Sequence, residues 1–376
     1  MPIRIAVVKE TRPGEHRVAL VPSVAERLIK LGATVAMQSG AGNAVKLPDA
    51  VFRGVTCVDD VTALVGSADI VLAVQPPPLD TVQAMREGAI LISFIYADDE
   101  RELVDLLSRK KITCFAMERV PRISRAQAMD ALSSQATLSG YYATLMAATH
   151  LSRIFPRMTT AVGTLRPATV LVMGLGVAGL QALATAHRLG AVVEGYDVRP
   201  ETKEEAASVG AKFVETGVDA RGEGGYAREL TEDEKLKVEA AVTSHVRQAD
   251  VIITTAAVPG RRAPRLLSKA QIEGMRAGSV IIDLAADSGG NCELTRPGET
   301  VEVGPVTIVG PINVPSMLGE HASELYAKNL LNFLELLIRD NELKPDWSDE
   351  VVAKTALVRA NAEDETAPTA KAKAPV

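Results

Sequence analysis

Residues 169–197 have the sequence TVLVMGLGVAGLQALATAHRLGAVVEGYD and give the strongest indication of fold in the chain. An apolar run rich in β-branched residues leads into Gly174, Gly176 and Gly179, and an apolar stretch with helical spacing follows. A second apolar run then ends at the acidic residue Asp197. This succession of strand, glycine turn, helix, strand and acid predicts a βαβ unit that binds a dinucleotide.

The predicted role of each residue differs. Gly174 permits a tight turn, Gly176 lets the backbone approach a pyrophosphate, and Gly179 lets helix and strand pack closely. The helix N-terminus directs N–H groups and a positive dipole end at phosphate. Asp197 is expected to hydrogen-bond the adenosine ribose and repel a 2′-phosphate, which favours NAD over NADP. Arg199 offsets part of that charge, and a bare packing turn without ligand is the alternative.

Composition excludes several classes of protein. The 376 residues suffice for two domains with separate cores. A net charge of −6 and only 3% aromatic residues give no support for a nucleic-acid surface. Apolar runs end before the roughly 18 residues of a membrane span, and no signal peptide is expected. Cys57, Cys114 and Cys292 have no metal-binding spacing, so we expect a reducing compartment and no metal.

Short β-branched runs alternate with helical segments along most of the chain, which is typical of parallel α/β layers. The predicted fold class is therefore α/β, with two doubly wound (Rossmann-like) parallel-sheet domains joined by long helices with a cleft between them. Strands are predicted at 3–8, 34–38, 69–74, 89–95 and 113–117 in the first domain, and at 169–174, 192–197, 250–256, 279–285 and 306–310 in the second.

Two long helical segments are expected to join the domains. One begins near Ser124 within residues 123–155, and the other covers 323–342. The predicted first domain is discontinuous, comprising 1–132 and about 320–358, and the NAD(H)-binding domain covers 133–319. Residues 360–376 are small, polar and contain proline, which predicts a disordered tail.

Two further segments allow more than one interpretation. Residues 217–235 contain four glycines and many charges, with Tyr226 as the only aromatic, so they form either a functional loop or a solvated excursion. Ser124 and Gln127 fit an S-x-x-Q capping box, which explains both without a ligand. Gln127 and Asp130 could instead share a helix face that points into the cleft. The five histidines show no pattern of a hydrolytic triad.

Nearly the whole chain to about residue 340 resembles the superfamily of alanine dehydrogenases and of proton-translocating nicotinamide nucleotide transhydrogenases. The segments that carry the resemblance are KETRPGEHRVALVPSVAERLIKLGATVAMQSGAG (9–42), ERVPRISRAQAMDALSSQ (118–135), GLGVAGLQALATAHRLGA (174–191), the Tyr226 loop, GSVIIDLAADSGGN (278–291), INVP (312–315) and AKNLLNF (327–333).

Two positions separate the two branches of this superfamily. Alanine dehydrogenases have an arginine for the substrate carboxylate, a lysine in a VKEP-like motif and a histidine in a following strand. Here Arg17 matches the arginine, but Gln75 in VQPP stands at the lysine position and Tyr96 at the histidine position. Neutral Gln75 is no proton carrier, and an ordinary tyrosine, with a pKa near 10, is a poor base at neutral pH. Hydride transfer between two nicotinamides needs positioning rather than a base.

The resemblance implies that Arg122, Gln127, Asp130 and Ser133 lie near the nicotinamide, and that Tyr226 closes over the bound nucleotide. These five residues form the predicted catalytic set. The predicted cofactor-binding set is Arg122, Ile123, Ser124, Gln127, Gly174, Gly176, Val177, Ala178, Gly179, Asp197, Val198, Arg199, Gly225 and Ala257.

The resemblance further implies the NAD(H)-binding subunit of a transhydrogenase of the Si-specific, proton-translocating type. NADP(H) would be bound by a partner beta subunit, and a homodimer of this chain would dock on membrane subunits at the cytoplasmic face of a bacterial inner membrane. The chain itself is expected to contribute no transmembrane segment. The alternatives are an alanine dehydrogenase-like enzyme and a non-catalytic NAD-sensing module.

Overall fold

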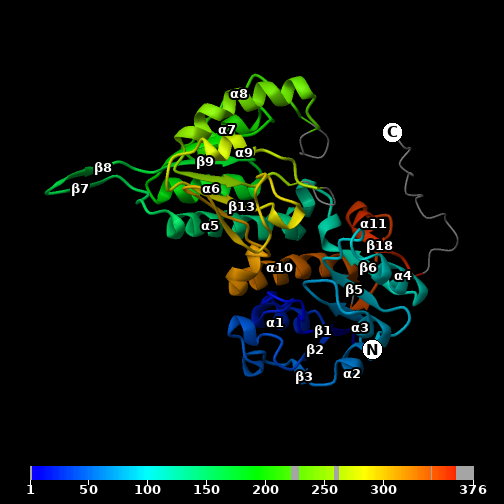
Figure 1. The fold of residues 1–376 in the computed structure, drawn as a ribbon. Coiled ribbons are helices and arrows are strands. Elements are labelled where there is room, and N and C mark those ends of the chain that lie inside the picture. Colours follow the sequence, from blue (N-terminus) through cyan, green and yellow to red (C-terminus); the bar gives the residue numbers. More distant parts are fainter. Residues whose placement is uncertain (1, 222–227, 258–261, 340, 361–376) are drawn as a thin grey trace. The chain divides into compact units, whose positions relative to one another are not determined.

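The computed structural model describes residues 2–221, 228–257, 262–339 and 341–360 and divides into two compact units (Figure 1). Unit 1 comprises residues 1–12, 17–130 and 326–376, and unit 2 comprises residues 13–16 and 131–325. The predicted disordered tail, from residue 361 onward, lies outside the described residues. Each unit contains a seven-stranded sheet.

The sheet of unit 1 has the strand order β18-β6-β5-β4-β1-β2-β3, in which only β18 is antiparallel to its neighbour. Without β18, this is the doubly wound order 3-2-1-4-5-6. The strands are β1 (Arg4–Val7), β2 (Thr34–Gln38), β3 (Thr56–Val58), β4 (Ile70–Leu72), β5 (Ile90–Ser93), β6 (Thr113–Ala116) and β18 (Ala356–Val358). A separate two-stranded sheet, formed by β16 (Ile338–Arg339) and β17 (Glu342–Leu343), follows α10 (Gly319–Leu337) in the chain. The helices are α1 (Pro22–Lys30), α2 (Val61–Gly66), α3 (Leu79–Ala84), α4 (Arg101–Arg109), α11 (Glu350–Thr355) and the part of α10 (Gly319–Leu337) from residue 326 onward.

Alternate side chains of these strands enter different layers, as the period of two requires. Ala6, Val71 and Leu91 share one core with α2, α3 and α4. On β6, Phe115 stands edge-on to Phe333 of α10 with ring centroids 5.1 Å apart. Strands β4, β5 and β6 are buried along their whole length, which explains their largely apolar sequences.

The sheet of unit 2 repeats this topology with the order β11-β10-β9-β12-β13-β15-β14, in which β14 alone is antiparallel. The strand order reverses between β9 and β12, which is where doubly wound sheets bind ligands. The strands are β9 (Thr169–Met173), β10 (Val192–Tyr196), β11 (Lys212–Phe213), β12 (Val251–Thr254), β13 (Val280–Asp283), β14 (Thr300–Val303) and β15 (Val306–Val309). The helices are α5 (Ala131–His150), α6 (Val177–Arg188), α7 (Thr202–Ser208), α8 (Glu232–Gln248) and α9 (Lys269–Glu273).

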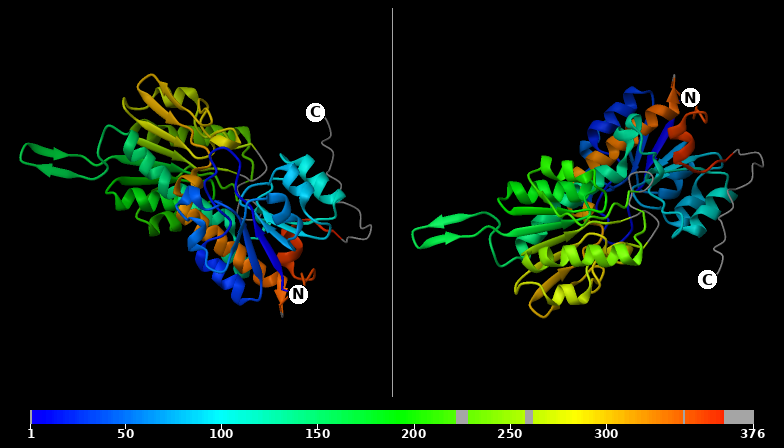
Figure 2. Two further views of the ribbon diagram at one scale, coloured as in Figure 1. Left: turned by 90° about the horizontal axis from the view of Figure 1, so that it is seen from below. Right: turned by 90° about the horizontal axis from the view of Figure 1, so that it is seen from above.

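Helices cover both faces of this sheet (Figure 1). Val170 and Val172 of β9 pack in a core with Ala143 of α5 and Leu183 of α6. The intervening residue Leu171 faces the opposite core, which contains side chains of α8 and α9. A two-stranded hairpin, β7 (Met158–Thr160) with β8 (Gly163–Leu165), projects from unit 2 in every view (Figure 1, Figure 2).

The predicted fold class of two doubly wound parallel sheets is confirmed. Each of the ten predicted strands occurs, within two residues at either end. The sequence patterns missed the short edge strands β3, β11, β14 and β18, the β7–β8 hairpin and the β16–β17 pair. No helix in the described part of the chain is long and apolar enough to cross a membrane.

The predicted continuous helix from Ser124 is wrong. Residues Ser124–Met129 form a 3₁₀ helix, and α5 begins only at Ala131. Asp130 between them has φ −71° and ψ 89°, outside the helical region, and so breaks the run. The predicted capping box is also wrong, because Ile123 occupies the N-cap position and no side chain of the described residues caps that helix.

A buried carboxylate at the amino end of the unit 2 sheet illustrates what holds this unit together. Asp250 is fully buried and accepts hydrogen bonds from Arg153 (2.5 Å), Arg166 (2.7 and 2.8 Å) and the backbone N–H of Thr169 (2.9 Å). Burial alone would raise the pKa of Asp250, but the hydrogen bonds from Arg166 and Thr169 and the nearby positive charge lower it to about 2.

We expect Asp250→Asn to lower the free energy of unfolding by about 2 kcal/mol at pH 7, since each pKa unit corresponds to about 1.4 kcal/mol. Because the pKa is lowered on folding, this stability is fully present above the ordinary value of 3.8 and is lost as the pH falls through about 2. Urea unfolding between pH 7 and pH 2 should therefore show the two proteins converging in acid. Asp219→Asn, which alters an exposed, solvent-screened pair with Arg221, serves as the control and should leave the urea midpoint almost unchanged over the same pH range.

Candidate dinucleotide site

The turn between β9 and α6 requires glycine for steric reasons. Gly174 has a φ of +94°, and a Cβ there would lie 2.9 Å from the backbone nitrogen of Ala256. Positive φ together with this crowding excludes any larger residue. The N–H of Gly174 donates to the carbonyl oxygen of Tyr196 over 2.8 Å, which fixes the turn to the end of β10.

Two more glycines set how closely the first turn of α6 is packed. A Cβ on Gly179 would overlap the carbonyl oxygen of Gly174 and lie 2.9 Å from its carbonyl carbon. From the other side, a Cβ on Gly140 of α5 would overlap the carbonyl oxygen of Ala178. Backbone therefore touches backbone on both sides of this turn, so its position is fixed to within a few tenths of an ångström.

The N-terminus of α6 is open. Gly176 is its N-cap residue, and no side chain of the described residues caps it. Gly176 and Val177 are exposed, and a Cβ on Gly176 would meet no atom within 4 Å. The first N–H groups of a twelve-residue helix, with its positive dipole end, thus face an uncrowded surface. Such a terminus suits an anionic group.

Asp197 and Arg199 form a closed pair beside this turn. Asp197, which is 8% exposed, accepts hydrogen bonds from the backbone N–H of Leu175 (2.7 Å) and of Arg199 (2.9 Å). The Arg199 guanidinium also donates to both carboxylate oxygens, over 2.9 and 2.8 Å. The hydrogen bonds that Arg199 donates to Asp197 raise the pKa of Arg199. A ribose that binds Asp197 must therefore share it with Arg199 or displace the guanidinium.

Thr255 contacts the glycine turn and was not identified from the sequence. Its hydroxyl donates to the carbonyl oxygen of Gly174 over 2.8 Å, and its N–H donates to Met173 over 2.9 Å. It follows β12, so this contact joins the two strands between which the strand order reverses. A threonine directly after an apolar strand is common. Its role here depends on its contact with Gly174, which is 81 residues away in the chain, so no local pattern indicates it.

In unit 1, the 3₁₀ helix Ser124–Met129 determines which side chains of residues 122–130 are buried and which are exposed. Residues three apart in a 3₁₀ helix lie on one line, and Ala126 and Met129 are both buried. Arg125 donates to Asp349 over 2.6 and 3.0 Å, and the Ala128 carbonyl accepts from Asn329 over 2.9 Å.

The remaining row of side chains, three residues apart on this helix, lies at the surface. Ser124 and Gln127 are exposed, and Asp130, in line with them, is half-buried. Arg122, just before the helix, is exposed as well. The structure thus gathers Arg122, Gln127 and Asp130 on one short element.

The other predicted residues lie as follows. Ile123 is half-buried at the N-cap of the 3₁₀ helix, Ser133 is half-buried in the first turn of α5, Val198 is half-buried after β10, and Ala257 is exposed after β12. Gly225 and Tyr226 lie outside the described residues.

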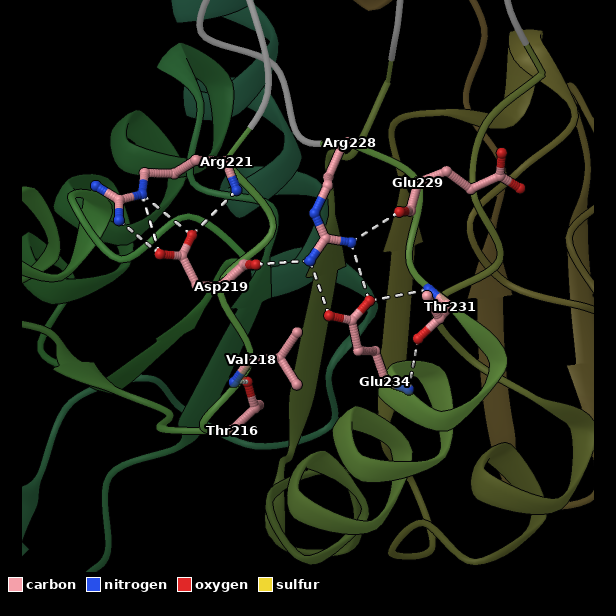
Figure 3. Close-up of polar contacts among 8 residues, drawn as sticks. All are labelled: Thr216, Val218, Asp219, Arg221, Arg228, Glu229, Thr231 and Glu234. Carbon is pink, nitrogen blue, oxygen red and sulfur yellow. Dashed lines mark hydrogen bonds and ion pairs between the residues drawn. The ribbon is translucent and has the colours of Figure 1, made fainter.

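The segments on either side of residues 222–227 are hydrogen-bonded to each other (Figure 3). The N–H of Arg228 donates to the carbonyl of Ala220 over 2.9 Å, and its guanidinium binds Glu234 over 2.8 and 2.9 Å. Glu234 also completes a capping box with Thr231 at the start of α8. These bonds, led by that from Arg228, lower the pKa of Glu234 to about 2.

Gln75 and Tyr96 follow β4 and β5, at the carboxyl edge of the unit 1 sheet. The Gln75 N–H donates to Glu10 over 3.2 Å, and the Tyr96 N–H donates to Glu118 over 2.8 Å. Burial raises the pKa of Glu118. Arg17 is buried, with 4% of its surface exposed. The described residues contain no group of His, Cys, Asp and Glu side chains that could hold a metal ion.

Comparison with known proteins agrees with this architecture. The family model described as "Alanine dehydrogenase/PNT, N-terminal domain" matches residues 6–139, and "Alanine dehydrogenase/PNT, C-terminal domain" matches residues 143–363. The NAD(P) transhydrogenase subunit alpha (first part) of Rhodospirillum rubrum is 45% identical over 95% of this chain and 96% of its own length. The alanine dehydrogenase of Mycobacterium tuberculosis is 29% identical over 78% of this chain and 76% of its own length.

Among solved structures, the transhydrogenase from Sinorhizobium meliloti superimposes with a TM-score of 0.84 at 40% identity, covering 95% of this chain and 97% of that one. Two Rossmann-like units, one with an open glycine turn, define the class of dinucleotide-binding α/β oxidoreductases. The chain belongs to the alanine dehydrogenase/PNT family and, within it, to the NAD(P) transhydrogenase alpha subunits.

Proposed function

We propose that this chain is the NAD(H)-binding subunit of a proton-translocating transhydrogenase. It holds NADH with the pyrophosphate over Gly174–Gly179 and the adenosine ribose on Asp197. The nicotinamide of this NADH passes a hydride to NADP⁺ on a partner beta subunit. The observation that carries this proposal is the combination of an open α6 N-terminus with Gln75 and Tyr96 at the two positions where alanine dehydrogenases have proton-carrying groups.

The chemistry explains why such a site needs no acid or base. Hydride transfer between two nicotinamides moves no proton to or from a substrate heteroatom, so the protein has to position the rings and exclude water. Arg122, Gln127, Asp130, Ser133 and Tyr226 are proposed to do this at the nicotinamide and its ribose. Three of them share one rigidly anchored segment, which suits a positioning role.

The proposal extends to the assembly. The chain acts as a homodimer at the cytoplasmic face of a bacterial inner membrane, where partner subunits carry the NADP(H) site and the proton pathway. The name of the Rhodospirillum rubrum relative, which describes one portion of an alpha subunit, supports a multi-subunit arrangement.

The experiment that tests this function mixes the purified chain with a transhydrogenase NADP-binding component and follows reduction of an NAD analogue by NADPH. We expect activity only in the mixture. NADH binding without such activity would leave an NAD-sensing module, and oxidation of NADH by the isolated chain with pyruvate and ammonia would establish an alanine dehydrogenase.

The pairing of Asp197 with Arg199 yields a further prediction. Asp197→Ala should raise the Kd for NADH by a factor that corresponds to about 1–3 kcal/mol, because the ribose hydroxyls lose their acceptor. It should also narrow the preference for NADH over NADPH, since Arg199 is then released toward a 2′-phosphate. Fluorescence titrations with both nucleotides measure this, and Arg199→Ala is the matched control that keeps the carboxylate. An unchanged Kd for NADH in Asp197→Ala would contradict the ribose assignment.

A further inference from the structure

Thr255 and Ala256, the first two residues after β12, form a wall beside the glycine turn. A Cβ on Gly174 would lie 3.0 Å from Thr255 Oγ1 and 3.2 Å from the Cα of Ala256, so these residues are in contact with the turn. The Thr255 hydroxyl bonds the Gly174 carbonyl. Any shift of the Ala256 backbone therefore changes the surface next to Gly174.

The side chain of Asn291 fixes the backbone of Ala256 by hydrogen bonds. Its side chain, which is fully buried, accepts the N–H of Ala256 over 3.0 Å. Its amide nitrogen donates to the carbonyl of Ala256 over 2.7 Å and to that of Pro264 over 2.8 Å. Both amide protons and the amide oxygen are thus used on main-chain groups, which is the full donor capacity of an asparagine.

The side chain of Asn291 is itself fixed by its surroundings. Gly289 and Gly290 precede it with φ values of +98° and +75°, and its own carbonyl accepts the N–H of Leu266 over 2.7 Å. A Cβ on Gly290 would lie 3.0 Å from the fully buried carboxylate of Asp283.

That carboxylate accepts the N–H of Cys292 over 3.0 Å and the hydroxyl of Thr295 over 2.6 Å. The DSGGN sequence therefore builds a rigid arm that ends in the Asn291 amide.

The position of the arm indicates which half of a dinucleotide it serves. A dinucleotide lies across the point where the strand order reverses, here between β9 and β12. Asp197 follows β10, on the β9 side, and is the group suited to the adenosine ribose. Thr255 and Ala256 follow β12, on the other side of the reversal, where the second nucleotide would run.

We propose that Asn291 is a positioning residue for the nicotinamide half of bound NAD(H), acting through the backbone of Ala256. This inference rests on the proposed function, because it takes NAD(H) to be the ligand. Removing the Asn291 amide donors releases the Ala256 carbonyl and lets the wall move away from Gly174. The adenosine half, held at the α6 N-terminus and Asp197, is then unaffected.

The test compares two ligands on the full-length chain. In Asn291→Asp, which has nearly the same shape but lacks the amide donors, the Kd for NADH should rise at least tenfold. The inhibition constant of 5′-AMP, measured by its competition with NADH, should stay within twofold of the wild-type value. Thr255→Val removes only the hydroxyl that donates to the Gly174 carbonyl. It should likewise raise the Kd for NADH more than the inhibition constant of 5′-AMP, and it provides a second test if Asn291→Asp folds poorly.

A matched control is Thr295→Val, which removes a hydrogen bond to Asp283 in the same network without touching residues 255–257. It should lower the melting temperature and keep the ratio of the NADH and 5′-AMP constants. If Asn291→Asp weakens both ligands equally, or changes neither, Asn291 is structural only and the inference is overturned. Wild-type protein that binds no NADH would instead refute the proposed function.

Discussion

Gly179→Ala is expected to abolish NADH binding and to lower the stability of unit 2 by about 3 kcal/mol, the upper part of the range for overpacked sites. The added methyl group would overlap the carbonyl oxygen of Gly174 and lie 3.1 Å from Thr255 Oγ1. Neither neighbour can withdraw, because the first is main chain and the second is hydrogen-bonded to it. The helix must therefore move away from the turn, and the N–H groups that face the pyrophosphate move with it.

Gly176→Ala provides the matched control for this prediction. Its Cβ would meet no atom within 4 Å, and its φ of −77° is allowed for alanine. The variant should keep the wild-type melting temperature, yet it should bind NADH more weakly because the methyl group occupies the approach of the pyrophosphate. Calorimetric melting and NADH titration of both variants measure these effects.

Gly179→Ala is expected to lower the melting temperature by about 10 °C, in line with the usual relation between free energy and melting temperature for units of this size. A Gly179→Ala protein with wild-type melting and NADH affinity would mean that the turn yields more than its packing indicates. A Gly176→Ala protein with unchanged NADH affinity would place the pyrophosphate elsewhere.

The strands could be predicted from the sequence because parallel strands buried on both faces have continuous apolar runs. Their order could not, since nothing in a run such as residues 251–254 says that it pairs with β9 rather than β10. The edge strand β14 was missed because Thr300 and Glu302 are exposed and interrupt its short apolar pattern.

The break at Asp130 was missed for a different reason. The residues from Ser124 onward are acceptable in an α-helix, and local preference alone predicts one. The buried side chains of Ala126 and Met129, with the bonds from Arg125 and Asn329, select a 3₁₀ helix instead. Tertiary contact thus overrode propensity in the segment that carries most of the predicted catalytic set.

The site divides in the same way. Gly174, Gly176 and Gly179 were identifiable because their spacing is local and each replaces a side chain that would clash. Thr255 and Asn291 act on main-chain groups 81 and 35 residues away, so no local spacing indicates them. The consecutive glycines before Asn291 were the available signal, since two positive φ values in succession rigidly direct the next residue.

Gln127→Ala is expected to slow hydride transfer in the mixture with an NADP-binding component about 100-fold, the usual effect of slightly misplacing reacting groups. The 3₁₀ helix keeps Gln127 exposed, and its side chain makes no hydrogen bond to any other described residue. Its removal should therefore leave the melting temperature within about one degree of wild type. The Kd for NADH should change by less than threefold, because the pyrophosphate and adenosine contacts remain.

Arg125→Ala separates positioning by Gln127 from loosening of the segment that carries it. Arg125 lies in the same 3₁₀ helix and binds Asp349, whose pKa that hydrogen bond helps lower to about 2. Its removal should loosen the segment and lower the melting temperature. If Gln127→Ala slows transfer with unchanged melting while Arg125→Ala lowers melting with a smaller loss of transfer, the Gln127 side chain itself positions the nicotinamide. If Arg125→Ala slows transfer as strongly, the rigidity of residues 124–129 carries the effect, and Gln127 has no role of its own.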